Sequence, residues 1–322
     1  MDAWIQEFVE CIAGVEGTSL DFEKGFLLRY RHMPKSIYKF REVNDYSIEN
    51  LSTGTVWLTS PSKYNDPYDC AATISYAELT KSVPETVQRR IIQENRLDSF
   101  LTAEQIETAL STDEPVMAIA RMMLQRDPTV KAEAIEPMLQ VLRDAQARAM
   151  APYLKDSVEY VRDGIKMCSF CATNRPIIMW SHYAKNHQGY CIEYDTATWP
   201  EPAKRMLFPV IYSSTMFDCT KYYAAAAKDI GNFNNVFAQV QALYKSPEWE
   251  YEQEWRLVFI GGIISKEMNY TVGLPKRVLL GARIEHADRE RVIAVCRSTG
   301  TEVHQMKLVP DRFGLDSELV SL

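Results

Sequence analysis

Residues 36–60 read SIYKFREVNDYSIENLSTGTVWLTS, and this stretch predicts how the fold begins. Residues 36–41 have the β-branched and aromatic character of a short strand. Residues 44–54 predict a helix, because Asn44 or Asp45 can cap its N-terminus and Gly54 can end it. Residues 55–60 predict a second strand. The stretch therefore predicts a strand–helix–strand unit at the start of a mixed α/β body.

The second half of the chain continues this α/β pattern. We expect strands over residues 165–173, 189–195, 207–213, 254–262, 275–284 and 301–309. We expect helices over residues 176–186, 218–244 and 287–299. The first thirty-odd residues predict two helices packed on the outside of this body.

The middle of the chain differs in composition. Residues 77–163 hold only Phe100, Tyr153 and Tyr160 of all the aromatic residues, and contain neither Trp nor Cys. Apolar residues recur there at helical spacing, and we expect its prolines to start or break helices. We therefore divide the chain into N-terminal helices (1–35), an α/β core (36–76 and 164–322) and a helical insertion (77–163). The insertion is interpreted as a packing and spacing element rather than a functional lid.

Charge and cysteine content argue against several classes of protein. With 36 basic against 43 acidic residues and a net charge of −7, the chain does not predict a broad nucleic-acid surface. A small cationic pocket around Lys39, Arg41 and Arg256 remains compatible with this charge. The apolar runs are too short for a membrane span, and the first residues lack the basic start of a signal peptide. The seven Cys show no framework spacing, so we expect reduced thiols in a cytoplasmic protein.

The common cofactor and hydrolase motifs are absent from the sequence. It contains no GxGxxG, GxxxxGK[ST], HExxH or GxSxG. Cys168 and Cys171 form a CxxC pair, but no second pair follows, so buried thiols are favoured over a zinc site. His182 and His187 are poorly spaced for a metal. We therefore expect no metal site, while a catalytic or substrate-contact role for His182 stays open.

The most informative cluster is Tyr251-Glu252-Gln253-Glu254-Trp255-Arg256. In a strand, Glu252, Glu254 and Arg256 share one face, and the opposite face turns Trp255 into the core. Burying such charges unpaired is expensive. One interpretation is a salt-bridge network, and the other is a catalytic carboxylate whose pKa is raised by its neighbour. The candidate partners for a network are Lys39, Arg41 and Lys245.

Two further segments are rich in polar groups. Residues 60–69 are either a rigid loop held by Asn65 and Asp66 or a ligand-binding loop at a strand end. Residues 179–184 read Met-Trp-Ser-His-Tyr-Ala on a predicted helix. Their aromatic members fit a core, which would leave the Ser and His partly exposed.

These motifs together resemble a bacterial family known as domain of unknown function 2971. The resemblance covers roughly residues 36–300. It is carried by Asn65-Asp66-Pro67-Tyr68-Asp69, then by residues 179–184, and then by residues 251–256, in this order.

The opening unit is also distantly similar to the start of the ADP-ribosyltransferase fold. That likeness implies an α+β fold with a mixed, mainly antiparallel sheet core and a helical insertion. The fold uses a His or Arg on its first strand, a Ser or Tyr on its second strand and a late Glu. The counterparts here are Lys39 or Arg41, then Ser60, and then Glu252 or Glu254.

The first hypothesis is thus an enzyme with NAD as its substrate, either an ADP-ribosyltransferase or an NAD glycohydrolase. The resemblance implies that Lys39 or Arg41 holds the pyrophosphate or ribose, and that Tyr38 or Tyr64 stacks on nicotinamide. Glu254, in preference to Glu252, would stabilise the oxocarbenium-like state. The expected catalytic residues are Glu254, Glu252 and His182. The expected NAD-binding residues are Tyr38, Lys39, Arg41, Ser60, Tyr64, Asn65, Asp66, Asp69, Tyr183 and Arg256.

The partners and the alternatives follow from the same residues. By analogy, the acceptor would be a protein or nucleic acid, with a regulatory partner protein and a role as a toxin or phage-defence effector. The second hypothesis is a non-catalytic module that binds a nucleotide or a protein in the same cleft. The third is a metal-dependent nuclease with Asp66, Asp69, Glu252 and Glu254 as oxygen ligands.

Overall fold

The computed structural model describes residues 2–321 and is built around one eight-stranded sheet. The strand order is β14-β13-β12-β5-β1-β4-β10-β6, and only the β12–β13 pair is parallel. The prediction of a mixed, mainly antiparallel sheet is therefore confirmed. The strands are β1 (Ser36–Arg41), β4 (Lys166–Cys171), β5 (Tyr190–Asp195), β6 (Leu207–Pro209), β10 (Glu254–Phe259), β12 (Arg277–Leu280), β13 (Glu302–Leu308) and β14 (Leu315–Leu319).

The predicted strand–helix–strand unit is confirmed at the start of the sheet. After β1 comes α3 (Asp45–Thr53), where Asn44 accepts from the Ser47 backbone N–H and Gly54 ends the helix at φ 64°. The next strand, β2 (Thr55–Leu58), does not join the large sheet but pairs with β11 (Met268–Thr271). Its side chains complete the core cluster under α3.

Helices cover both faces of the sheet. Leu51 of α3 packs in one core cluster with residues of α13 (His286–Thr299) and with Ile37 of β1. On the other face, Trp180 of α9 (Ile177–Tyr183) packs edge-on against Phe40 of β1. Alternation along β1 thus turns Ile37 to one layer and Phe40 to the other.

The N-terminal helices are more deeply integrated than an outer layer. Phe8, Cys11 and Ile12 of α1 (Ala3–Ile12) are buried in a core cluster. On α2 (Phe22–His32), Arg29 is fully buried, and its Nη1 donates to three carbonyls, including that of Arg205 at 2.6 Å. Those carbonyls lie at and after the end of α10 (Glu201–Arg205), so a guanidinium satisfies acceptors that the helix leaves free.

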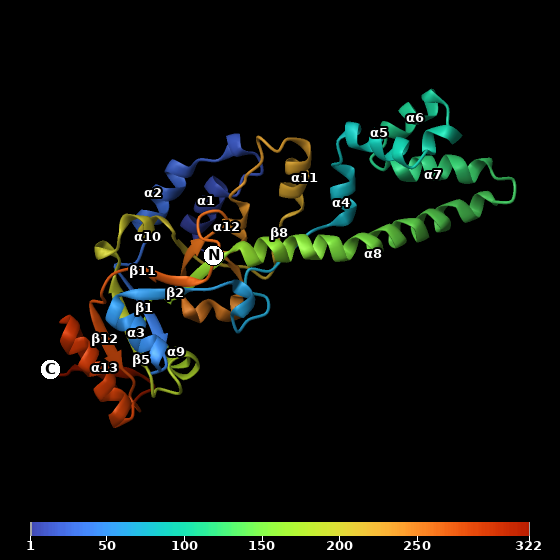
Figure 1. Cartoon of the computed structure of the whole chain (residues 1–322). Coiled ribbons are helices and arrows are strands. Elements are labelled where there is room, and N and C mark those ends of the chain that lie inside the picture. Colours follow the sequence, from blue (N-terminus) through green and yellow to red (C-terminus); the bar gives the residue numbers. More distant parts are fainter. Residues whose placement is uncertain (1, 322) are drawn as a thin grey trace.

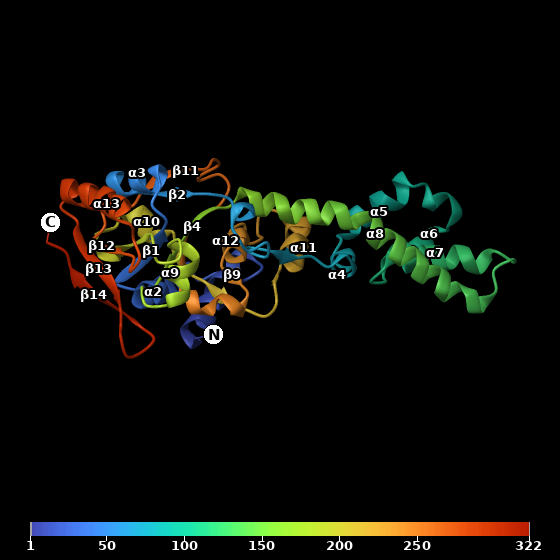
Figure 2. The same cartoon turned by 90° about the horizontal axis from the view of Figure 1, so that it is seen from below.

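The middle segment forms helices, as its composition predicts, and extends away from the sheet (Figures 1 and 2). The longest helix runs from the sheet body to the far end of this segment, where the shorter helices gather (Figure 1). The helices are α4 (Tyr76–Lys81), α5 (Glu85–Glu94), α6 (Ala103–Leu110), α7 (Pro115–Arg126) and α8 (Ala132–Gly164).

Two expected helix breaks were wrong. Pro137 and Pro152 lie inside the continuous helix α8. A proline inside a helix frees the carbonyl four residues earlier. Here those carbonyls belong to Glu133 and Arg148, which are exposed, so water can bind them. Each proline therefore costs less folding free energy than a proline that leaves a buried carbonyl without a hydrogen bond.

Two other expected elements are shorter than the sequence suggests. The helix expected over 218–244 is two helices, α11 (Thr220–Lys228) and α12 (Phe237–Gln241), separated by a turn at Gly231. The strand expected over 207–213 splits at Val210 into β6 and β7 (Ile211–Tyr212). Because β7 leaves the large sheet to pair with β9 (Tyr244–Lys245), Lys245 is brought beside the first residues of β10. A further short pair joins β3 (Ala72–Thr73) to β8 (Phe217–Asp218).

Two glycines allow backbone segments to approach closely at the end of the sheet. A Cβ on Gly281 would lie 2.2 Å from the His187 carbonyl oxygen, and one on Gly189 would lie 2.1 Å from that of Arg41. We expect Gly281→Ala to lower the free energy of unfolding by about 1–3 kcal/mol, because the neighbouring backbone must move. Urea unfolding measures this change. Gly164→Ala is the matched control, since nothing lies within 4 Å of the added Cβ, and an equal loss in both variants would contradict the account.

Candidate active site

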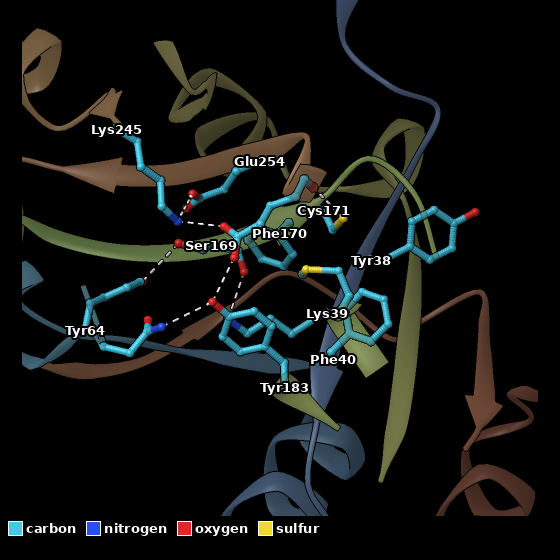
Figure 3. A pocket seen from close by; sticks show the side chains of 13 residues that line it. Tyr38, Lys39, Phe40, Tyr64, Ser169, Phe170, Cys171, Tyr183, Lys245 and Glu254 are labelled. Atoms are coloured by element: carbon cyan, nitrogen blue, oxygen red, sulfur yellow. Dashed lines mark hydrogen bonds and ion pairs between the residues drawn. The ribbon is translucent and has the colours of Figure 1, made fainter. Parts of the chain in front are cut away.

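A small pocket opens where β1 and β4 separate. The two strands pair only at Tyr38 and Cys171, and beyond this pair Lys39 Nζ spans the gap to the Ser169 carbonyl oxygen at 2.8 Å. Figure 3 shows the side chains that line this pocket, here called the carboxylate pocket. Its volume is about 100 Å³. Its lining residues are Tyr38, Lys39, Phe40, Tyr64, Asn65, Ser169, Phe170, Cys171, Met179, Tyr183, Lys245, Glu252 and Glu254.

The two glutamates reach this pocket through a sharp change in backbone direction. Glu252 ends the 3-10 helix η5 (Pro247–Glu252), Gln253 has a positive φ of 47°, and Glu254 begins β10. The predicted start of the strand at Glu254 is therefore confirmed, whereas Glu252 lies before the strand and does not share a strand face with Glu254. The expected alternation is confirmed from Glu254 onward, because Trp255 enters the core on the opposite face.

Both glutamates share one ammonium group. Lys245 Nζ lies 2.6 Å from Glu252 Oε2 and 2.8 Å from Glu254 Oε2, and all three side chains are buried. Arg256 Nε binds Glu254 Oε1 at 2.7 Å, and its Nη2 forms an ion pair with Asp69. Buried charges need this kind of pairing, because desolvation of an unpaired ion costs several kcal/mol.

The network gives the two glutamates different pKa values. Burial favours the neutral acid in Glu254, but Arg256 and Lys245 outweigh it and hold the pKa of Glu254 well below its usual range. Burial and the charge of Glu254 raise the pKa of Glu252, against the opposing effect of Lys245. Glu254 is thus a permanent anion with both oxygens bonded to cations. Glu252 is the carboxylate whose pKa is displaced toward the range useful for proton transfer.

Tyr183 holds Glu252 from the other side. Its hydroxyl donates to Glu252 Oε1 at 2.8 Å, while Asn65 Nδ2 donates to the Tyr183 oxygen at 3.4 Å (Figure 3). Burial, and then the charge of Glu252, raise the pKa of Tyr183 well above its usual value, so it stays a hydrogen-bond donor. Each oxygen of Glu252 therefore has one donor, and an oxygen has room for a second donor from a ligand.

The carboxylate pocket continues into a larger groove. The two cavities share Lys39, Phe40 and Tyr183, and the groove measures about 1020 Å³. Arg41 and His182 line this groove. Here the Tyr251 hydroxyl and His182 Nδ1 lie 3.5 Å apart. We call this space the outer groove, and it adds the volume that a nucleotide-sized ligand needs.

The structure separates the predicted site residues into three groups. Nine line the two joined cavities, namely Tyr38, Lys39, Arg41, Tyr64, Asn65, His182, Tyr183, Glu252 and Glu254. Asp69 and Arg256 lie behind the pocket as a buried ion pair. Of the small cationic pocket for which the net charge left room, Lys39 and Arg41 line the cavities, but Arg256 does not, because it is fully buried and bonded to Glu254 and the Ala242 carbonyl.

Ser60 and Asp66 line neither cavity. The Ser60 hydroxyl donates to the Asp163 carbonyl at 3.5 Å, and its backbone N–H donates to Glu267 at 3.3 Å. Asp66 Oδ1 accepts from the Tyr68 backbone N–H at 2.9 Å, which is the local turn bond of the rigid-loop interpretation. These two residues shape the loop that carries Tyr64 and Asn65 into the pocket.

Lys245 is the residue whose central position the sequence did not reveal. The sequence suggested Lys245 only as one of three possible salt-bridge partners, yet its ammonium group binds both glutamates. No local motif marks it, since its position depends on the β7–β9 pair, which sequence patterns did not predict. Its place seven residues before Glu252 offers no helical or strand spacing that could have identified it.

The cysteine side chains are buried and form no disulfide bonds. Cys168 and Cys171 are buried, and all seven cysteines carry free thiols. Within residues 2–321, no group of three or more His, Cys, Asp or Glu side chains is arranged to hold a metal ion. Among the described residues, no helix combines the length and the apolar character needed to cross a bilayer.

Comparison with known proteins supports the predicted family resemblance. The model of the family described as "Protein of unknown function (DUF2971)" matches residues 179–257. This segment contains the part of α9 from Met179 onward, the outer-groove residue His182 and the Lys245–Glu252–Glu254 network. No curated protein and no solved structure matches the chain. The family match therefore covers the glutamates and Lys245 but not the pocket residues of β1, β4 and the loop at Tyr64, and no structural neighbour supports the ADP-ribosyltransferase likeness.

Proposed function

We propose that this protein is an enzyme that cleaves the bond between nicotinamide and ribose in NAD, as an ADP-ribosyltransferase or NAD glycohydrolase. The observation that carries the proposal is Glu252, a buried carboxylate with a raised pKa. It lies in a narrow aromatic pocket that opens into a nucleotide-sized groove. A carboxylate held in place before the reaction stabilises positive charge that develops on a sugar.

In this proposal the C–N bond breaks and nicotinamide leaves with the bonding electron pair. Positive charge develops on the ribose, where Glu252 stabilises it. A water molecule or an acceptor hydroxyl then forms the new bond at that carbon, and its proton passes to Glu252. Glu254 does not take the proton, because Arg256 and Lys245 keep its pKa low. This reverses the preference for Glu254 that the family likeness suggests.

The remaining residues position the substrate. Lys39 lines both cavities and Arg41 lines the outer groove, and these two cations suit the pyrophosphate. The rings of Phe40 and Tyr64 offer flat apolar surface to nicotinamide in the carboxylate pocket. Lys245 and Tyr183 act as positioning residues, because they fix both oxygens of Glu252.

The alternatives receive less support from the geometry. A metal-dependent nuclease would need several free carboxylate oxygens at one point, but both oxygens of Glu254 are bonded to cations, Asp66 accepts a backbone N–H, and Asp69 has only its Oδ2 without a partner. A non-catalytic module explains the network equally well as a structural element, but gives no role to the lining position of Glu252 beside a cavity, where its oxygens have room for a further donor. A protein or nucleic-acid acceptor, a regulatory partner and an effector role remain part of the proposal by analogy alone.

Removal of the Tyr183 hydroxyl should shift the pH dependence of nicotinamide release. Its hydrogen bond favours the ionised form of Glu252, so Tyr183→Phe raises the pKa of Glu252 further. Because Glu252 acts as an anion, the acid limb of kcat/KM against pH should move to higher pH. The exposed Tyr153→Phe is the control. An acid limb that stays in place, or moves to lower pH, would rule out this role for the hydrogen bond.

A further inference from the structure

A third cavity lies on the other side of α9 from the carboxylate pocket. It measures about 800 Å³ and is not part of the site proposed above. Ser181 and Ile177 of α9 line it, together with the segment after this helix, Arg283 and the turn between β13 and β14. We call it the basic cavity. Its lining residues are Ile177, Ser181, Asn186, His187, Arg283 and residues 308–314.

The charged groups of this cavity favour an anion. Arg283 is exposed and forms no ion pair with any carboxylate among residues 2–321. Arg312 has only loose, exposed contacts, at 3.7 Å to Asp311 and 3.9 Å to Asp316. Asp311 is the one acidic residue of the lining, against two guanidinium groups. A guanidinium binds carboxylate or phosphate oxygens in preference to other groups.

His187 is a buried polar group whose hydrogen bonds are incomplete. Only 8% of it is exposed, its Nε2 lies 3.4 Å from Ser181 Oγ, and its Nδ1 has no partner. The Ser181 hydroxyl also lies 3.1 Å from the Ile177 carbonyl, to which it can donate. Burial, and then the charge of Arg283, lower the pKa of His187, so it is neutral without a ligand. An anion bound beside Arg283 would offset the positive charge of Arg283 and so raise the pKa of His187 again.

The backbone at this point is held in an unusual conformation. Lys185, Asn186 and His187 all have positive φ, at 48°, 55° and 69°. Such residues cost about 1 kcal/mol or more each and are found where a ligand or a catalytic group must be placed. Lys185 lines the outer groove, while Asn186 and His187 line the basic cavity. The three residues therefore join the two cavities.

The rim of the basic cavity is apolar. Ile177 is 37% exposed, and Phe313 is completely exposed on the β13–β14 turn. A phosphate alone would use only the arginines, whereas a ligand with an apolar part would also cover these side chains. The volume also suits an organic molecule rather than a single ion.

We propose that the basic cavity is a second ligand site, which binds an organic phosphate monoester. The phosphate would bind Arg283 and Arg312, and the apolar part would lie against Ile177 and Phe313. Because Ser181 and Tyr183 lie on the same short helix, an occupied cavity can affect the position of Glu252 through Tyr183. The binding claim does not depend on NAD cleavage.

Phenyl phosphate is a suitable probe, since it combines a phosphate monoester with an aromatic ring. We expect isothermal titration calorimetry on the full chain to detect binding, and Arg283→Gln to weaken it about tenfold or more. Arg297→Gln, an exposed arginine of α13 that does not line the cavity, should keep the wild-type affinity. Arg41→Gln should also keep it, which separates this site from the outer groove.

Further arms of the experiment test each part of the proposal. Phe313→Ser should weaken phenyl phosphate but leave the weaker binding of inorganic phosphate unchanged. The NMR titration of His187 should show a higher pKa with phenyl phosphate present. Absence of binding at about 10 mM phenyl phosphate would overturn the proposal. Unchanged affinity in Arg283→Gln would also overturn it, and so would a loss of affinity that occurs only in Arg41→Gln. Nicotinamide release is not needed for any of these readouts.

Discussion

Replacement of Arg256 by methionine should lower the free energy of unfolding by about 3–5 kcal/mol. Arg256 is fully buried and bonds Glu254, Asp69 and the Ala242 carbonyl. Methionine fills most of the space but leaves two buried carboxylates short of a cation. Urea unfolding at pH 7, followed by circular dichroism, measures the loss.

The matched control is Arg289→Met, since Arg289 is a partly exposed arginine whose ion pair with Glu290 lies on the surface. Surface pairs contribute about 0–1 kcal/mol, so this variant should unfold almost like the wild type. If Arg256→Met also lost less than about 1 kcal/mol, the network would not be the structural support described here.

Glu252→Gln should reduce the rate of nicotinamide release about 100-fold or more, with a much smaller change in stability than Arg256→Met. Glutamine keeps the shape of the side chain: its oxygen can still accept from Lys245, and its amide N–H can donate to the Tyr183 oxygen in place of the bond that Glu252 accepts. It removes the negative charge that the reaction requires. Steady-state release of nicotinamide, together with a thermal melt of the same sample, measures both effects.

Glu250→Gln is the control for this substitution. Glu250 lies in the same 3-10 helix, two residues earlier, but is exposed and lines neither of the two joined cavities. It should retain wild-type activity. Equal activity in Glu252→Gln and the wild type would assign Glu252 a structural role only.

The sequence predicted the elements of the fold better than their partners. The cap at Asn44 and the stop at Gly54 are local signals, so α3 and its flanking strands could be placed. The pairing of β2 could not be predicted from local sequence, because its partner strand β11 lies more than 200 residues away. The helix breaks expected at the two prolines of α8 were wrong for a related reason. Their cost depends on whether the freed carbonyls are exposed, and only the packed structure decides that.

In the candidate site, too, the sequence predicted local character but not the contacts between distant segments. The polar character of residues 252–256 indicated paired charges, and that pairing is now visible in Lys245, Glu254 and Arg256. Which glutamate is held ionised depends on the distances to two cations brought in by other strands. Period-2 alternation placed both glutamates on one face. The positive φ of Gln253 instead gives Glu252 its own position beside Tyr183.

We propose that the carboxylate pocket cleaves NAD with Glu252 as the reacting carboxylate. The most direct test of this proposal is the amount of free nicotinamide formed when the full-length protein is incubated with NAD labelled in the nicotinamide ring. The incubation is run with and without cell lysate, which supplies acceptors and partner proteins. The account predicts that label is released in proportion to wild-type protein in at least one of the two conditions, and that Glu252→Gln releases none above background. Release by the wild type that does not exceed that of Glu252→Gln in either condition would contradict it.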